Sequence, residues 1–306
     1  MADVQIRSAV YKNRESLIME TGEIRVELIP GLGGKVVSLL YKPTGKEWLV
    51  QSDLQALKQP AYGSNFGDAD MSGWDECFPT IAPCAAEAGG ALMLPDHGEV
   101  WALAWDAEVS EGRIDCSVGG VALPYRLGRS LYFTSPDTLR MAYRAENLGE
   151  SPLQFLWVPH PQFAVSEPTR IELPPSAQEM LCVFGGAARQ EGRTYAWAAE
   201  ADVDASQTGD GRKFYAPGKV SEGRCGLFCE RSGNWLRMDF DPQRVPYIGV
   251  WIDEGMFNRQ NAIALEPSIG YYDSLDRARA NGTAQTILPG QACEWSLTVS
   301  FGGGAA

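Results

Sequence analysis

The sequence is poor in histidine, with only His97 and His160 in 306 residues. It also lacks any apolar run near the ~20 residues that cross a bilayer as a helix. Its first residues, MADVQIRSAVYKNRE, have no apolar core of the kind found in signal peptides. We therefore expect no membrane partner and a cytoplasmic location.

Paired-cysteine motifs are absent as well. The seven cysteines are scattered, and the one close pair, Cys225 and Cys229, has no histidine nearby to complete a zinc site. An odd number of scattered thiols is typical of a reducing compartment, which again favours the cytoplasm. We expect no metal site and no cofactor.

Several other signatures are missing. The chain has no GxSxG elbow of an α/β-hydrolase, and GLGGK at Gly31–Lys35 lacks the spacing of a phosphate-binding loop. This glycine-rich segment lies between two strand-like runs, so it predicts a hairpin turn. A net charge of −13 repels phosphate backbones, and we expect no nucleic-acid partner. Since no repeat or low-complexity linker interrupts the chain, we expect one domain over residues 1–306.

Period-two alternation of apolar and polar residues recurs along the whole chain. It is clear in residues 24–28 and again in runs such as GEVWALAWDAEV (from Gly98), TLRMAYRAEN, PYIGVWI and AIALE. The 33 glycines and 19 prolines supply frequent turns. Helical signals are confined to SDLQALKQ, from Ser52, and DSLDRARANG, from Asp273. The sequence therefore predicts an all-β fold, a large antiparallel β-sandwich with few short helices.

Both histidines lie in segments with a distinctive composition. His97 lies in LPDHGEVW, a turn with nearby carboxylates, and His160 lies in FLWVPHPQF. Pro159 and Pro161 are expected to end an apolar strand and to stiffen the backbone that carries the imidazole. A purely structural histidine is the ordinary alternative at either position.

The late segment PYIGVWIDEG predicts a strand with an unusual outer face. Alternation places Ile248 and its neighbours at i+2 and i+4 in the core, and places Trp251 and Asp253 on the other face. Aromatic rings pack on the C–H face of a sugar, and carboxylates accept its hydroxyl protons. We therefore expect Trp251 and Asp253 to contact a sugar.

The next run, NAIALEPS, places Glu266 on the same face as Ala262 and Ala264. Two small side chains beside a glutamate leave space above the sheet, and Pro267 is expected to end the strand. Partial burial would raise the pKa of the carboxyl group, which suits a general base. A solvated surface glutamate is the alternative.

A further segment, MSGWDECFPTIAP, brings together Trp74, Asp75 and Glu76. An aromatic plate beside two acceptors is a common arrangement for binding carbohydrate. An ordinary loop with a buried tryptophan explains the composition equally well.

Taken together, these motifs resemble the galactose mutarotase-like superfamily, which contains the aldose 1-epimerases and the hexose-6-phosphate epimerases. The resemblance runs from about Glu23 to Phe301. PDHGEVW resembles the first histidine motif of the family, and RAENLGESPLQFLWVPHPQF resembles its segment with Asn147 and His160 in matching places. ALEPSIGYYDSL resembles the late motif in which a glutamate precedes a proline.

The resemblance implies a β-sandwich with the site on a concave face, and it implies catalytic roles. Glu266 would be the general base that takes the proton from the anomeric hydroxyl, and His160 the general acid that protonates the ring oxygen. His97 would bind and orient the sugar. The chain carries Glu99 where phosphosugar relatives have basic groups, so an unphosphorylated sugar is expected.

Two other functions fit part of this pattern. The region NFGDADMSGWDECFPT has no arginine where the aldose 1-epimerases carry one, which is compatible with a non-catalytic carbohydrate-binding or sensor protein. A sugar lyase or hydrolase would use the carboxylates instead, and a glycosidase needs two of them roughly 5–9.5 Å apart.

Overall fold

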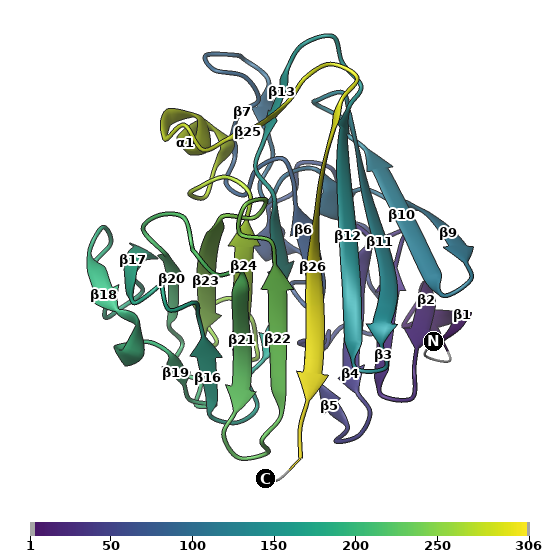
Figure 1. Ribbon diagram of the computed structural model, residues 1–306, viewed down its shortest axis with the longest axis vertical. Helices are drawn as coiled ribbons and strands as arrows, with labels where there is room; N and C mark the ends of the chain where they lie inside the picture. Colours follow the sequence, from purple (N-terminus) through teal and green to yellow (C-terminus); the bar gives the residue numbers. More distant parts are fainter. Residues whose placement is uncertain (1–3, 305–306) are drawn as a thin grey trace.

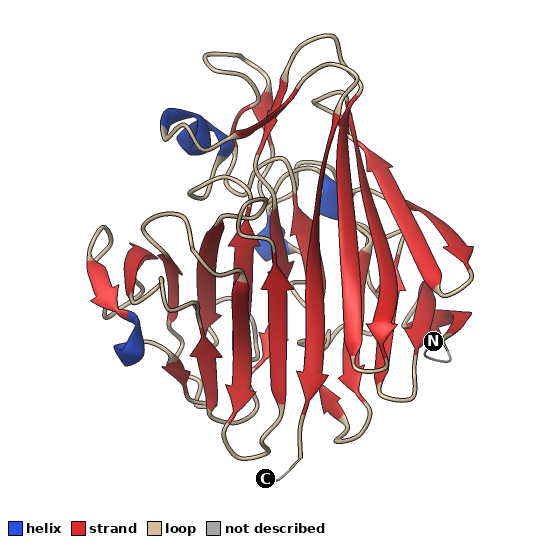
Figure 2. Ribbon diagram, viewed as in Figure 1, coloured by secondary structure: helices blue, strands red, loops and turns tan. Residues whose placement is uncertain are grey.

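The computed structural model describes residues 4–304, which form antiparallel sheets stacked in layers (Figures 1 and 2). In sheet order, the largest sheet contains β19 (Asp202–Val203), β16 (Thr169–Glu172), β21 (Arg224–Cys229), β22 (Trp235–Phe240), β26 (Ala292–Gly302), β12 (Thr138–Asn147), β11 (Tyr125–Ser135), β10 (Arg113–Gly119) and β9 (Asp106–Ser110). Figure 1 shows the long strands β26, β12 and β11 crossing in front of the second layer.

Two further sheets form that second layer. The seven-stranded sheet contains β1 (Gln5–Tyr11), β2 (Arg14–Glu20), β3 (Ile24–Ile29), β4 (Lys35–Tyr41), β6 (Trp74–Cys77) and β14 (Val158–Pro161), with β5 (Lys46–Glu47) beside β4. The six-stranded sheet contains β15 (Phe163–Ala164), β24 (Ala262–Ser268), β23 (Tyr247–Asp253), β20 (Gly211–Tyr215), β17 (Glu179–Phe184) and β18 (Thr194–Ala196).

Small elements complete the described part of the chain. Two short ribbons pair β7 (Cys84–Ala85) with β8 (Met93–Leu94), and β13 (Leu153–Phe155) with β25 (Gln285–Ile287). The helical elements are α1 (Leu275–Ala280) and the 3₁₀ turns η1 (Phe66–Asp68), η2 (Val100–Ala102) and η3 (Trp197–Ala199). The predicted all-β sandwich with few short helices is confirmed. No helix within residues 4–304 is long and apolar enough to cross a membrane.

Apolar residues from both layers meet in one extended core. Ile248 and Val250 of β23 point into it, as do Leu297 and Val299 of β26, and all four are buried. The predicted alternation along PYIGVWI is therefore confirmed. Burial of such side chains contributes roughly 1.5–3 kcal/mol each, which fixes the face that each strand turns to the core.

A seam without ladder hydrogen bonds separates the two sheets of the second layer. Trp157 and Ile269 exchange backbone hydrogen bonds at one end of the seam, and β15 pairs with β24 at the other. Between these points, Pro159 and Pro161 occupy the positions whose N–H groups would face β24, and Pro267 of β24 lies opposite Pro159. The prolines therefore remove donors from this ladder.

The expected strand end at Pro159 was wrong, whereas β14 does end at Pro161. β14 passes Pro159 because its hydrogen bonds run to β6, where His160 pairs with Asp75. β24 likewise passes Pro267, which pairs with Ile248 of β23.

Two local predictions also failed, and a third succeeded. SDLQALKQ is not helical, because Leu57 exchanges hydrogen bonds with Asn13 instead of with its own segment. The expected strand over GEVWALAWDAEV is interrupted by η2, and β9 begins only at Asp106. The predicted helix at DSLDRARANG is present as α1, with Ser274 at its N-cap position.

Candidate active site

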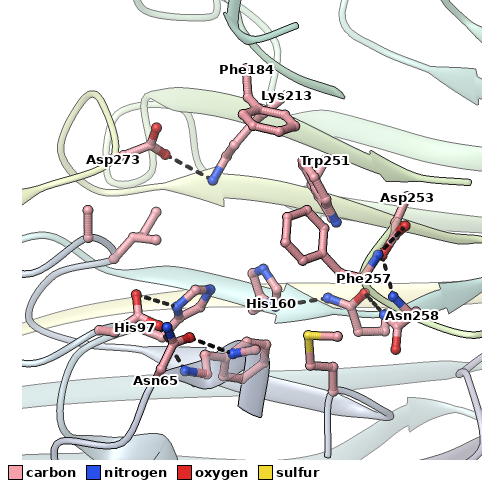
Figure 3. Close-up of a pocket in the computed structure, with 17 residues that line it drawn as sticks. Asn65, His97, His160, Phe184, Lys213, Trp251, Asp253, Phe257, Asn258 and Asp273 are labelled. Carbon is pink, nitrogen blue, oxygen red and sulfur yellow. Dashed lines mark hydrogen bonds and ion pairs between the residues drawn. The ribbon is translucent and has the colours of Figure 1, made fainter. Parts of the chain in front are cut away.

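A cavity of about 330 Å³ lies on the outer face of the second layer, over β14, β23 and β20 (Figure 3). His160 is at its centre, with His97 and Asn65 on one side and Trp251, Phe257 and Asn258 on the other. A volume of this order is at the small end of ligand-binding pockets and suits a compact molecule.

The strand register brings His160 and Glu266 together across the proline seam. The pairs Trp157–Ile269 and Phe163–Ile263 set a register in which His160 faces Glu266. The Nε2 atom of His160 lies 3.7 Å from Oε1 of Glu266. His160 lines the cavity and is 6% exposed, whereas Glu266 is fully buried behind it and does not itself line the cavity.

Hydrogen bonds fix the orientation of the His160 ring. Asn258 Nδ2 donates to Gln162 Oε1 at 3.0 Å, so the amide nitrogen of Gln162 is the group 3.0 Å from His160 Nδ1. Gln162 therefore donates to Nδ1, which leaves the proton of the neutral ring on Nε2, toward Glu266. Burial lowers the pKa of His160 well below its usual value, and the nearby charges of His97 and Lys213 add to that effect.

The pKa of Glu266 shifts in the opposite direction to that of His160. Burial raises the pKa of its carboxyl group, although the Lys213 ammonium 3.0 Å from Oε2 partly offsets that rise. Within residues 4–304, no donor forms a hydrogen bond with Oε1. Glu266 pairs with Gly249, where an added Cβ would lie 3.0 Å from Oε2 and 2.7 Å from the Tyr215 ring.

His97 reaches the cavity from the loop after β8. Its backbone has φ of 57°, and Gly98 follows with φ of 75°. A Cβ at Gly98 would come within 2.2 Å of the carbonyl oxygen of Phe78, so this position requires glycine. The histidine–glycine pair in the sequence therefore reflects a tight turn that aims the imidazole at the site.

Stacking and an acidic neighbour orient the His97 ring. It stacks on Phe66 with centroids 4.2 Å apart and lies 5.0 Å, edge to face, from the His160 ring. Its Nδ1 atom is 3.0 Å from Oδ1 of Asp96. Burial would raise the pKa of Asp96, but the hydrogen bond and charge of His97 outweigh it and lower the pKa.

Aromatic side chains form one wall of the cavity. Trp251 lies 5.7 Å from both Phe184 and Phe257 between ring centroids. Asp253 also lines the cavity, but its carboxylate accepts backbone hydrogen bonds from residues 255–258. Asp253 therefore anchors the loop that carries Phe257 and Asn258.

The segment with Trp74, Asp75 and Glu76 is β6 and not a loop, and these residues do not line the cavity. Trp74 is in the core, edge to face with Phe163. Glu76 is buried among the groups that donate to it, Arg129, Tyr143 and Trp157.

Asp75 shares the face of His160 but is covered and paired with Lys35, whose Nζ lies 2.6 Å away. Burial raises the pKa of both acids, Asp75 and Glu76.

The sequence reasoning missed two charged residues beside Glu266. Lys213 of β20 lies 3.0 Å from Glu266 and 2.9 Å from Asp273, and Asp273 accepts a hydrogen bond from Tyr215 at 2.7 Å. The alternation in GRKFY, which puts Lys213 and Tyr215 on one face of a strand, was the available signal. Within residues 4–304, no group of three potential ligands is arranged to hold a metal ion.

Neither the protein-family models nor the curated proteins contain a match to this sequence. Solved structures do resemble it. A protein named as a putative aldose 1-epimerase from Klebsiella pneumoniae has a TM-score of 0.75 at 13% identity, with 98% of this chain and 84% of that chain covered. The Slr1438 protein from Synechocystis has a TM-score of 0.74 at 16% identity, covering 96% and 98%.

A galactose mutarotase-like protein from Clostridium acetobutylicum has a TM-score of 0.69 at 13% identity, with 99% of each chain covered. Likeness at such low identity concerns the arrangement of strands and not the chemistry. This chain therefore has the fold of the galactose mutarotase-like proteins.

Proposed function

We propose that this protein is an aldose 1-epimerase-like isomerase that interconverts the anomers of an unphosphorylated sugar. The observation that carries the proposal is the pairing of His160, which lines a cavity with an aromatic wall, with the buried Glu266 3.7 Å behind it. The names of the Klebsiella and Clostridium structures support it.

The reaction needs one proton acceptor and one proton donor. Glu266 takes the proton from the anomeric hydroxyl while His160, in its imidazolium form, gives its Nε2 proton to the ring oxygen, and the C1–O5 bond breaks to leave an open-chain aldehyde. The imidazolium also carries a proton on Nδ1, so in this form the Gln162 amide has to turn its oxygen toward Nδ1. Rotation about the C1–C2 bond and the reverse transfers close the ring as the other anomer. Positioned proton transfers of this kind contribute about 10²–10⁴-fold each.

The environment of the pair suits repeated exchange of a proton. Burial raises the pKa of Glu266 and lowers that of His160, so the two values move toward each other. Both shifts favour the state after ring opening (carboxylic acid and imidazole) over the state before it (carboxylate and imidazolium), which eases transfer of a proton from the sugar to Glu266.

The charges of the cavity favour an uncharged substrate. Lys213 is the one lysine or arginine among the described residues that line it, and two carboxylates already hold its ammonium group. A phosphate would face Asp96 and Asp273 without a free cation to bind it. His97 is the residue we assign to orienting the sugar, and Trp251 the residue we assign to stacking on it.

Anomer exchange measured by NMR or polarimetry over a panel of aldoses tests this function. We expect acceleration by the wild type, and a loss of about 10²–10⁴-fold in both Glu266→Gln and His160→Ala. Glu294→Gln, at an exposed glutamate of β26, is the matched control and should retain full activity. Acceleration that persists in Glu266→Gln would rule out the assigned base.

A non-catalytic sugar sensor is the second candidate, favoured by the ion pair that already occupies one oxygen of Glu266. In that case the wild type would bind sugars, as followed by tryptophan fluorescence, and would not accelerate anomer exchange of any sugar that it binds.

A further inference from the structure

Glu266 is at one end of a chain of polar groups, Lys213, Asp273 and Tyr215, that the reaction described above does not use. Lys213 Nζ lies 3.0 Å from Glu266 Oε2 and 2.9 Å from Asp273 Oδ1, and Tyr215 donates to the same Asp273 oxygen. Lys213, Glu266 and Tyr215 are buried or nearly so. A desolvated chain of this kind is costly to assemble unless every member is paired, so its presence under the cavity calls for an explanation.

We propose that Lys213 is a positioning residue for Glu266, which it holds by Oε2 as a carboxylate with Oε1 directed to His160, and that Asp273 and Tyr215 hold Lys213 in place. This inference rests on the proposed function only for its catalytic consequence. The electrostatic part concerns the ionisation of Glu266 and can be measured without any substrate.

The sheet register explains how Lys213 reaches a residue two strands away. β20, β23 and β24 are neighbours, and Gly249 of β23 lies between Tyr215 and Glu266. Glycine leaves the space through which the carboxylate and the ammonium group meet, since a Cβ there would lie 3.0 Å from Glu266 Oε2. The contact is therefore built into three strands and not into a mobile loop.

Asp273 is fixed independently of Lys213. Its backbone carbonyl accepts a hydrogen bond from Ala82 at 2.6 Å, and the preceding residue, Tyr272, has φ of 104°. The Tyr215 hydroxyl, 2.7 Å from Oδ1, supplies a further constraint. Lys213 is thus held between two acids, which makes it unsuited to capture an anionic substrate and suited to orient Glu266.

The ionisable groups that face Glu266 come from several elements. They are Lys213 and Tyr215 of β20, Asp273 after β24, His160 of β14, Cys77 of β6 and His97 of the loop after β8. Burial raises the pKa of Glu266, Lys213 lowers it, and Asp273 raises it. Lys213 and Asp273 therefore act on Glu266 with opposite signs although they belong to one ion-paired cluster.

Because Lys213 and Asp273 shift the pKa of Glu266 in opposite directions, their substitution distinguishes this role of Lys213 from a merely structural one. Carbon-13 NMR of protein labelled at the glutamate carboxyl carbon follows the titration of Glu266, whose signal is identified by its loss in Glu266→Gln. We expect Glu266 to titrate at higher pH in Lys213→Met and at lower pH in Asp273→Asn than in the wild type. The double variant should lie between the two single variants.

The matched control is Lys42→Met, which removes a lysine–glutamate pair with Glu20 of β2, outside the cavity, and should leave the Glu266 titration unchanged. An unchanged titration in Lys213→Met, or shifts of the same sign in both single variants, would overturn the proposal. If Lys213→Met does not fold, as judged by thermal unfolding, the direction of the shift in Asp273→Asn and in the double variant still decides.

Activity gives the second readout. With an aldose that the wild type equilibrates, kcat/KM of Lys213→Met should be about tenfold below that of the wild type on the acidic limb of the pH profile, and the ratio of the two should approach one as the pH rises. The reason is that, on the acidic side, raising the pKa of Glu266 by about one lowers its carboxylate fraction about tenfold. A loss that is equal at every pH would contradict the role. If the wild type equilibrates no sugar, the proposed function fails while the NMR titration still decides whether Lys213 holds Glu266 ionised.

Discussion

Glu266 and His160 occur 106 positions apart in the chain and become neighbours through the register of β14 against β24, at a point where three prolines interrupt the ladder. Pro159, Pro161 and Pro267 lie where backbone N–H groups would otherwise join β14 to β24. The two side chains thus face each other across a part of the sheet that has no ladder hydrogen bonds.

The sequence allowed Glu266, His160 and His97 to be chosen, since each stands out in its local segment, and the resemblance supplied their roles. It did not reveal Lys213 or Asp273, because a lysine or an aspartate in a strand or turn usually faces water. Their pairing depends on the register of β20 against β23, which no local pattern specifies. Likewise, the local sequence around Trp74 and Glu76 fits a core strand as well as a binding loop.

The pH dependence of the reaction follows from the two opposing pKa shifts. Catalysis requires Glu266 ionised and His160 protonated, so the rate falls below the apparent pKa of the first and above that of the second. Because burial raises the pKa of Glu266 and lowers that of His160, the acidic and basic limbs of the pH–rate profile approach each other and the profile narrows. We expect a narrow bell on the acidic side of neutrality in kcat/KM, and a broad plateau extending above pH ~8 would contradict these shifts.

Gly249 provides a second test at the scale of one residue. In Gly249→Ala the new methyl group would meet the Tyr215 ring at 2.7 Å and Glu266 Oε2 at 3.0 Å. We expect a destabilisation of about 1–3 kcal/mol in urea unfolding and a fall in kcat with it. Gly31→Ala, where no atom lies within 4 Å of the new Cβ, should change neither quantity much. Equal behaviour of the two variants would show that the contact is not tight.

At the scale of elements, the strands follow from period-two alternation wherever one face is buried. The helical prediction for SDLQALKQ failed because the Asn13 side chain bonds to the backbone of Leu57. The strand pattern failed at prolines, because a strand can pass through proline when the missing N–H faces an unbonded edge. Both are tertiary effects, so a local pattern does not contain them.

The loop after β23 offers an element-scale prediction. Asp253 accepts hydrogen bonds from the backbone N–H groups of residues 255–258, and it thereby holds the segment with Phe257 and Asn258 against the cavity. Asp253→Ala should lower the free energy of unfolding by about 1–3 kcal/mol and raise KM for the sugar more than it lowers kcat. Hydrogen exchange should show faster exchange of these four amides.

Asp253→Asn is the conservative control, because its side-chain oxygen still accepts. It should retain much of the protection of these amides. Unchanged exchange in Asp253→Ala would mean that the loop is held by other contacts.

At the scale of the whole molecule, the seven cysteines remain free, and all but Cys293 are buried. Burial raises the pKa of Cys77, Cys225 and Cys293, which lowers the fraction of reactive thiolate. We expect the folded protein to react with a thiol reagent such as DTNB at no more than one site, slowly, and the unfolded protein at seven. Rapid reaction of several thiols in the folded protein would contradict this packing.

The predicted sandwich extends over nearly the whole described chain, and its fold is shared with solved structures of 13–16% sequence identity. A shared fold does not establish an activity, so the proposed function depends on the site itself. The central claim is that a sugar lies with its anomeric hydroxyl at Glu266 and its ring oxygen at His160.

A crystal structure of Glu266→Gln soaked with an aldose tests this claim most directly. We predict electron density for the sugar in the cavity, with the anomeric oxygen within ~3 Å of residue 266 and the ring oxygen within ~3 Å of His160 Nε2. A sugar bound elsewhere on the molecule, or bound in this cavity with its anomeric carbon directed away from both side chains, would contradict it.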